Sequence, residues 1–69
     1  METDLIRVNG RRRPLRARSV EALIHELGHA DRRGIAVAVN GVVVPRTNWA
    51  THGLETDDDV EIVGAVQGG

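Results

Sequence analysis

The chain opens with an alternation of apolar and polar positions that predicts a β-hairpin. Ile6 and Val8 are separated by a single arginine, so a strand at this point would bury one face. Asn9-Gly10 follows, and this dipeptide is a strong hairpin signal because both of its residues tolerate a positive φ. We therefore expect a return strand over residues 11–17. Pro14 lies within it and lacks the N–H that a central strand needs, which favours a position at the edge of the sheet.

A segment with helical spacing follows. Its apolar positions recur at i, i+3, i+4 and i+7, and they are Val20, Leu23, Ile24 and Leu27. Ser19 precedes them as a good N-cap, and Glu21 lies in the first turn, where the helix dipole favours an acidic residue. Gly28 suits the left-handed position at which many helices end. The sequence therefore predicts one short amphipathic helix between Ser19 and Gly28.

The alternation returns in the second half of the chain. Ile35, Val37 and Val39 alternate with two alanines, and Asn40-Gly41 repeats the dipeptide of the first turn. Residues 42–44 are three valines that can form the returning strand. This pattern predicts a second hairpin.

The last part of the chain predicts an irregular crossover and a final strand. Residues 46–53 show neither a strand period nor a long-helix period, although Asn48-Trp49-Ala50 could form a single helical turn. Leu54 is expected to reach the core. Residues 56–59 are of the types that form turns, and residues 60–63 are predicted to be the last strand.

The predicted order is hairpin, helix, hairpin, irregular crossover and strand, which indicates an α+β fold. One helix would cover one face of a mixed five-stranded sheet. The last strand is reached by a crossover, so it can lie in the middle of the sheet and parallel to the first strand. We expect one folded domain over residues 1–63 and an extended tail over residues 64–69.

Length and composition limit the classes of function. A chain of 69 residues buries only about 60% of its unfolded surface, so a deep catalytic cleft is difficult to build. The sequence has no cysteine, which excludes a disulfide framework and thiol chemistry of its own. No apolar run approaches the roughly 20 residues of a membrane helix, and the acidic start of the chain lacks the apolar segment of a signal peptide. We therefore expect a cytoplasmic protein that does not enter a membrane.

Arginine is concentrated in the first half of the chain. Residues 1–34 carry eight arginines and five acidic residues, whereas residues 35–69 carry one arginine and five acidic residues. The cluster Arg11-Arg12-Arg13 is a candidate for nucleic-acid binding. A solvated hairpin whose charges protect an edge strand is the favoured interpretation, because Trp49 is the only aromatic residue able to stack on a base. Contact with an acidic surface of a partner protein is a third interpretation.

The segment from His25 to His29 matches the H-E-x-x-H pattern of zinc proteases. Both histidines fall opposite the apolar stripe of the predicted helix, so we expect them to face solvent and not a cleft. Gly28 would end the helix just where the second ligand must be held. A catalytic zinc ion normally has three protein ligands, and His52, the other histidine, lies across an irregular loop. A solvated helix face is therefore favoured over a zinc site.

Two other features have a functional and a structural interpretation. Asp57-Asp58-Asp59 could hold a cation, but three consecutive residues in a turn point in different directions, so a plain turn is favoured. Trp49 could anchor a protein interface, but a single tryptophan in a small domain more often seals the core beneath a loop.

The last six residues, 64–69, are Gly-Ala-Val-Gln-Gly-Gly. Fully extended, six residues reach roughly 20 Å. The last two positions have no side chain, so their backbone can enter a slot too narrow for any other residue. The C-terminal carboxylate of Gly69 is then the reactive group at the tip. One interpretation is a frayed terminus. The interpretation that we favour is a tail that other enzymes use as a substrate.

The predicted order of elements, with Val-Asn-Gly at residues 8–10 and again at 39–41 and a terminal Gly-Gly, resembles the β-grasp fold of ubiquitin and the bacterial sulfur carriers. The resemblance covers nearly the whole chain and narrows to the ThiS family, the sulfur carriers of thiamin thiazole biosynthesis. The segments that carry it are residues 37–41, residues 43–46, Trp49-Ala50, Leu54, residues 59–63 and residues 65–69. The departures from the family pattern are the arginine-rich second strand, Gly64 and His29.

The resemblance implies a carrier that is not itself an enzyme. A ThiF-type adenylyltransferase would use ATP and Mg²⁺ to activate Gly69 as an acyl-adenylate. A persulfide donor such as a cysteine desulfurase would then supply sulfur, and a ThiG-type thiazole synthase would receive it from the Gly69 thiocarboxylate. Gly68 would give access to the partner's channel, and Ala65, Val66 and Gln67 would be recognised within it. The carrier would hold no cofactor or metal of its own and would bind no nucleic acid.

Three alternatives stay open on the sequence. The small subunit of molybdopterin synthase is also a β-grasp carrier with a Gly-Gly end, although Ala-Val-Gln before the glycines is less similar to it. The second is a β-grasp interaction module without tail chemistry, and the third is the zinc hydrolase.

Overall fold

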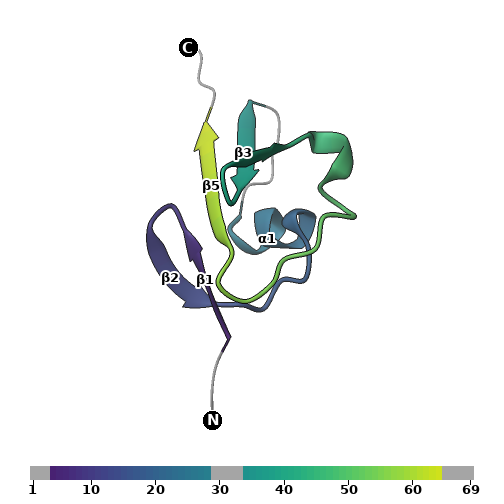
Figure 1. Ribbon diagram of the computed structural model, residues 1–69. Helices are drawn as coiled ribbons and strands as arrows, with labels where there is room; N and C mark the ends of the chain where they lie inside the picture. The colour runs from purple at the N-terminus through teal and green to yellow at the C-terminus, as the bar shows by residue number, and fades with distance from the viewer. Residues whose placement is uncertain (1–3, 29–33, 65–69) are drawn as a thin grey trace.

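The computed structural model describes residues 4–28 and 34–64 of the chain (Figure 1). Its strands are β1 (Leu5–Val8), β2 (Arg11–Pro14), β3 (Ile35–Val39), β4 (Val42–Val44) and β5 (Asp59–Gly64). The helices are α1 (Val20–Glu26) and the short 3-10 helix η1 (Arg46–Asn48). Within these ranges no helix is long and apolar enough to cross a membrane.

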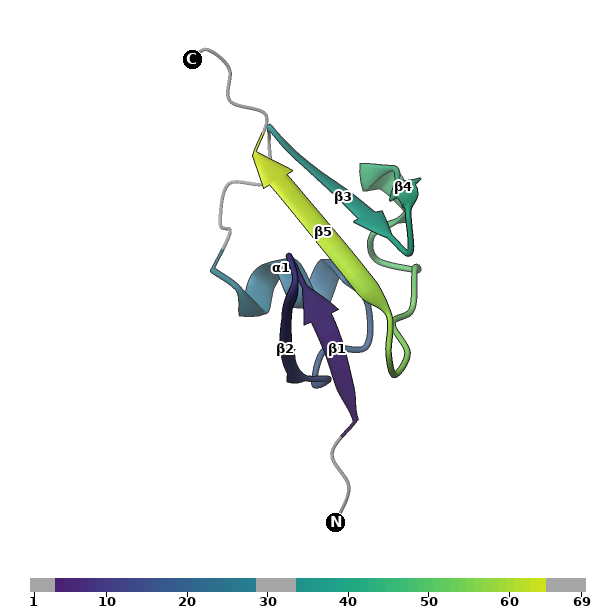
Figure 2. The ribbon, with the colours of Figure 1, turned by 60° about the vertical axis from the view of Figure 1, so that its left-hand side comes forward.

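The five strands form one mixed sheet in the order β2-β1-β5-β3-β4. The last strand, β5, is central, runs parallel to β1 and lies antiparallel to β3. Helix α1 packs across one face of this sheet (Figures 1 and 2). The predicted α+β class, the central place of the last strand and the edge position of Pro14 are all confirmed. The arrangement is the ubiquitin-like β-grasp fold.

Both hairpin turns have the backbone that the Asn-Gly dipeptides predict. Asn9 and Gly10 have φ angles of 51° and 84°, and Asn40 and Gly41 have φ angles of 54° and 84°. Positive φ at both central residues defines the type I′ turn, whose twist matches that of the flanking strands. The two turns therefore lie where the local sequence predicts.

Helix α1 also follows its sequence signals. The Ser19 side-chain oxygen accepts a hydrogen bond of 3.1 Å from the Ala22 N–H, which satisfies one of the free donors at the helix start. Gly28 has a φ of 83°, the left-handed conformation that ends a helix at little steric cost.

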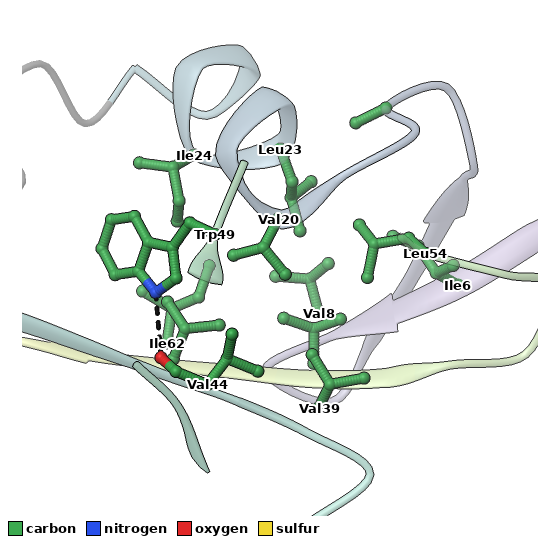
Figure 3. Close-up of a cluster of buried hydrophobic side chains, with 13 residues drawn as sticks. Ile6, Val8, Val20, Leu23, Ile24, Val39, Val44, Trp49, Leu54 and Ile62 are labelled. Carbon is green, nitrogen blue, oxygen red and sulfur yellow. Dashed lines mark hydrogen bonds between the residues drawn. The ribbon is translucent and has the colours of Figure 1, made fainter. Parts of the chain in front are cut away.

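The core lies between α1 and the sheet (Figure 3). It is built of apolar side chains from the helix, the strands and the crossover: Ile6, Val8, Ala17, Val20, Leu23, Ile24, Val37, Val39, Val44, Trp49, Leu54, Val60 and Ile62. Among the described residues no polar or charged residue is buried. Trp49, at 1% exposure, seals this cluster, so its structural interpretation is confirmed and the interface anchor is excluded.

Three boundaries differ from the prediction. Strand β2 ends at Pro14 and not at residue 17, because the chain then leaves β1 and pairs with the crossover: the Leu54 N–H donates to the Arg18 carbonyl at 3.0 Å. The helical turn of the crossover covers residues 46–48, directly after Pro45, and not residues 48–50. Strand β5 is longer than predicted by one residue at each end.

Candidate functional site

The candidate site is the C-terminal end of β5, from which the predicted tail continues. Strand β5 ends at Gly64, whose backbone is in register with Ile35 of β3. Gly64 therefore belongs to the sheet. The predicted site residues Ala65, Val66, Gln67, Gly68 and Gly69 lie outside the described residues, so the structure places the strand that leads to them and not the residues themselves.

The backbone of β5 is held along its whole length on the β3 side. Five consecutive register pairs join the two strands, from Val39 with Val60 to Ile35 with Gly64. On the β1 side the register extends only from Arg7 with Asp59 to Val8 with Val60. The C-terminal half of β5 therefore extends beyond β1, as Figure 2 shows.

Two asparagines bind β5 with their side chains. The Asn9 amide contacts the backbone of Ile62, with the Ile62 N–H donating to Oδ1 at 2.8 Å and Nδ2 donating to the Ile62 carbonyl at 3.2 Å. Asn40 accepts from the Asp59 N–H at 2.9 Å and donates to Asp58 Oδ1 at 2.9 Å. Sequence reasoning assigned both residues to turns alone and missed these contacts. Asparagine occupies the first central position of both turns, and this repetition was the one sequence feature that could have indicated the contacts.

The outer face of the sheet, opposite α1, changes character from one edge to the other. Toward the end of β5 it carries exposed valines, with Val63 60% exposed beside Ala36 and Val43 68% exposed beside Ala38, and the exposed Glu61 lies in register with Ala38 on β5. On the other half of the face, the exposed residues Arg7 and Arg12 lie in register on β1 and β2. The end of β5 therefore has the apolar pair Val63 and Ala36 on its outer face, with Glu61 two residues earlier in the strand.

The arginines of β2 divide between the two faces of the sheet. Arg13 projects toward the helix, and its Nη2 atom lies 2.9 Å from Oε2 of Glu26 on α1. Arg11 and Arg12 are exposed on this edge strand. The hairpin thus carries solvated charges at a sheet edge, in agreement with the favoured interpretation of the arginine cluster.

Two residues of the H-E-x-x-H pattern, His25 and Glu26, contact other side chains in the described chain. The His25 side chain is 62% exposed and its Nε2 lies 3.4 Å from Oε2 of Glu21. Glu26, the residue that would act as the base, is bound to Arg13. His29 lies outside the described residues. Over residues 4–28 and 34–64, no group of three or more His, Cys, Asp or Glu residues is suitable for holding a metal ion.

The acidic cluster before β5 is a turn. Asp58 Oδ2 accepts from the Glu55 N–H at 2.8 Å, while its Oδ1 accepts from Asn40. Asp57 has a left-handed φ of 73°, and its N–H donates to the Leu5 carbonyl at 2.7 Å. The Asp58 oxygens are thus used to shape the chain, which confirms the plain turn and does not support a cation site.

Two surface hollows of the described chain are small. One of about 100 Å³ is lined by Leu5, Ile6, Arg7, Arg12 and Asp57, and one of about 230 Å³ lies between Asp4 and residues 15–18 with Leu54. Both are smaller than the roughly 300–1,000 Å³ of sites that enclose a small molecule. Neither of these two hollows is therefore large enough to enclose a small molecule.

Comparisons with known proteins agree with this geometry. Residues 6–69 match the sequence model of the ThiS family, a range that includes the terminal Gly-Gly. The crystal structure of a thiamine biosynthesis protein (ThiS) from Geobacter metallireducens superposes with a TM-score of 0.80 at 25% sequence identity. The similarity covers 94% of this chain and 99% of that one. No curated protein sequence matches the chain. With the β-grasp sheet, its central last strand and this match over nearly its full length, the chain belongs to the ThiS family.

Proposed function

We propose that this protein is a sulfur carrier of thiamin biosynthesis whose reactive group is the C-terminal carboxylate of Gly69. The observation that carries the proposal is the family match through residue 69 on a chain whose last strand is the centre of the sheet. Strand β5 is paired with β3 as far as Gly64, and on its other side it is bound by β1 and then by the Asn9 side chain as far as Ile62, so it is a fixed base for a short arm. The small hollows of the body agree with a protein that is acted upon by other enzymes.

The first step activates the carboxylate. A carboxylate is a poor acyl donor, because oxide is a poor leaving group. An oxygen of Gly69 attacks the α-phosphorus of ATP, bound with Mg²⁺ in a ThiF-type adenylyltransferase, and pyrophosphate leaves. The product is an acyl-adenylate. The chain contains no lysine, so the activated end meets no side-chain amine of its own molecule.

The second step introduces sulfur. The terminal sulfur of a protein persulfide, such as that of a cysteine desulfurase, attacks the acyl carbon and AMP leaves, which forms an acyl disulfide. A thiol then cleaves the sulfur–sulfur bond and becomes the partner in a new disulfide, leaving the thiocarboxylate on Gly69. A ThiG-type thiazole synthase takes sulfur from this group. The absence of cysteine fits this role, since the transferred sulfur is carried on the chain end and not on a side chain.

Gly68 and the three residues before it would be read inside the partner's channel. A glycine at position 68 permits a close approach of the channel walls to the backbone. Val66 and Gln67 offer an apolar and an amide side chain for recognition, and Ala65 joins this segment to β5. The carrier contributes a nucleophilic oxygen and a narrow arm, and the enzymes contribute the catalytic groups.

Intact-mass spectrometry tests the proposal. The protein is incubated with its adenylyltransferase and Mg·ATP, and then with a persulfide donor and a thiol. We expect an AMP adduct, followed by a species in which one oxygen is replaced by sulfur, with fragmentation placing both on Gly69. The matched control is the chain that lacks Gly69, which should stay unmodified. An unchanged mass of the full chain with a competent enzyme would exclude the proposed function.

A further inference from the structure

The side chain of Asn9 continues the pairing of β1 with β5 after the backbone of β1 has turned away. The Asn9 N–H donates to the Val60 carbonyl at 2.9 Å, which is the last backbone bond on this side. Its φ of 51° then directs the chain into the turn. The side-chain amide nevertheless reaches Ile62 and binds both its N–H and its C=O, the two backbone groups that a longer parallel β1 would have bonded through two of its own residues.

On the side of β5 that faces β1, Asn9 makes the last contact before the strand ends. In a strand, alternate residues present their N–H and C=O to the same neighbour. Val60 and Ile62 face the β1 side, so the next residue to do so is Gly64, the last of β5, and no β1 residue is in register with it. Without the Asn9 amide, β5 beyond Val60 would be held by β3 alone, as an edge strand is.

Asn40 supplies an internal comparison. It occupies the same position of the same turn type, with a φ of 54°, and it also binds the backbone of β5 through its amide. Its contact is with Asp59, at the first residue of the strand, whereas Asn9 holds Ile62, two residues before the strand ends. The two asparagines therefore differ chiefly in their distance along β5 from the tail.

We propose that Asn9 is a positioning residue of the carrier, which fixes the direction in which the chain leaves the sheet toward its reactive end. This inference rests on the proposed function, because it concerns the delivery of Gly69 into a partner's site. Asn9 contacts no reacting group. It acts through Ile62, whose backbone it holds on the side that β1 leaves open.

The test compares Asn9→Gly with Asn40→Gly. Glycine adopts a positive φ without strain, so each variant keeps its turn and loses only the side-chain amide. Each loses two side-chain hydrogen bonds to or beside β5. The steady-state kinetics of adenylation are measured with the full-length carrier as the varied substrate, by release of pyrophosphate.

For Asn9→Gly we expect kcat to fall about tenfold, equivalent to about 1.4 kcal/mol, with KM unchanged. The folded body still docks, but the end of β5 must be reordered before Gly69 reaches the ATP. Asn40→Gly should keep the kcat of the original protein. If Asn9 contributed only to stability, the result would differ. A smaller folded fraction lowers the effective concentration of the carrier substrate, so the apparent KM of both variants would rise and kcat would stay unchanged. That result would overturn the inference.

Hydrogen exchange of individual amides provides a readout independent of activity. Asn9→Gly should lose protection at the Ile62 amide and keep it at Asp59, and Asn40→Gly should show the reverse. Full protection of the Ile62 amide in Asn9→Gly would show that the Asn9 side chain does not hold the backbone of Ile62. If Asn9→Gly does not fold, Asn9→Asp decides the question, because it keeps an acceptor for the Ile62 N–H, loses the donor to the Ile62 carbonyl and should show the same change in kcat to a smaller degree.

The carrier function and the positioning role of Asn9 are excluded by different results. If the original protein is not adenylated by a competent enzyme, the proposed function is excluded and the positioning role with it. If it is adenylated and Asn9→Gly matches Asn40→Gly in kcat, the carrier function stands and the positioning role is excluded.

Discussion

Trp49 donates its indole N–H to the backbone carbonyl of Val44 across 3.0 Å, inside the core and five residues away along the chain (Figure 3). This bond ties the crossover, which has little regular structure, to the edge strand β4. The guanidinium carbon of Arg46 lies 5.9 Å from the centroid of the same ring. A single side chain thus fills the core, satisfies a strand carbonyl and holds the loop that leads to β5.

Replacement of Trp49 by phenylalanine should lower the free energy of unfolding by about 1–3 kcal/mol, because the buried Val44 carbonyl loses its donor. Trp49→Ala should cost more, about 3–5 kcal/mol, since it also leaves a cavity. Urea unfolding followed by circular dichroism measures both. The control is Val43→Thr, on the exposed face of β4, the strand that contains Val44. Its free energy of unfolding should stay within about 0.5 kcal/mol of that of the original protein. An unchanged stability of Trp49→Phe would show that the bond contributes nothing.

Arg13 and Arg12 are adjacent but should respond in opposite ways to replacement by alanine. Arg13→Ala should lower the free energy of unfolding by up to about 1 kcal/mol, because its partly exposed ion pair with Glu26 joins β2 to α1. Arg12→Ala should be neutral or stabilising by about 0.2–1 kcal/mol. Arg12 on β2 lies directly opposite Arg7 on β1, and the substitution removes this repulsion between like charges.

A double-mutant cycle with Arg13→Ala and Glu26→Ala isolates the ion pair. We expect a coupling energy that decreases as salt is added, since salt screens exposed charges. A coupling of zero at low salt would mean that Arg13 stabilises the hairpin only by packing its aliphatic stem.

Asp57 holds a left-handed backbone conformation in the turn before β5, with a φ of 73°. Asp57→Gly should leave stability unchanged or raise it, because glycine adopts this conformation freely. Asp57→Val should lower stability by about 1–2 kcal/mol, because a β-branched side chain is strongly disfavoured in the left-handed region, which aspartate tolerates. Thermal unfolding of the two variants measures the difference. Equal stabilities would contradict the assigned turn geometry.

Gly68→Ala tests the requirement for a narrow tail. A methyl group at this position should obstruct a channel shaped for glycine and lower kcat/KM for adenylation by about tenfold or more, equivalent to at least about 1.4 kcal/mol. The free energy of unfolding should not change. Gly64→Ala is the matched control, because Gly64 lies within β5 and is not among the glycines with positive φ. Equal activity of the two variants would argue against a narrow channel.

Zinc should neither stabilise the protein nor give it hydrolytic activity. An ion that binds only the folded state raises the melting temperature, and the rise grows with the logarithm of the ion concentration above its dissociation constant. His25 lies at 62% exposure on the helix surface, and Glu26 is held by Arg13. We therefore expect equal melting temperatures with and without added zinc, both for the original protein and for His25→Ala. A zinc-dependent rise that His25→Ala abolishes would revive the metal-site interpretation.

Much of the fold could be predicted because its signals are local. The φ angles of the two turns follow from Asn-Gly alone, and the start of α1 follows from the Ser19 side chain and the apolar stripe behind it. The central place of β5 follows from its crossover connection. The ends of β2 and η1 were misplaced because they depend on what the chain meets later: the 52–54 segment draws the chain away from β1, and Pro45 starts the helical turn early.

The sequence by itself determined the order of the elements, the positions of the turns and the family resemblance of the tail, because each depends on neighbouring residues or on their period. Only the tertiary structure decided which side chains hold β5. Asn9 meets Ile62 across 53 positions of the chain, and Asn40 meets Asp59 across 19. No periodicity encodes such a partner, since it exists only once the sheet has brought the first hairpin, the second hairpin and the last strand side by side.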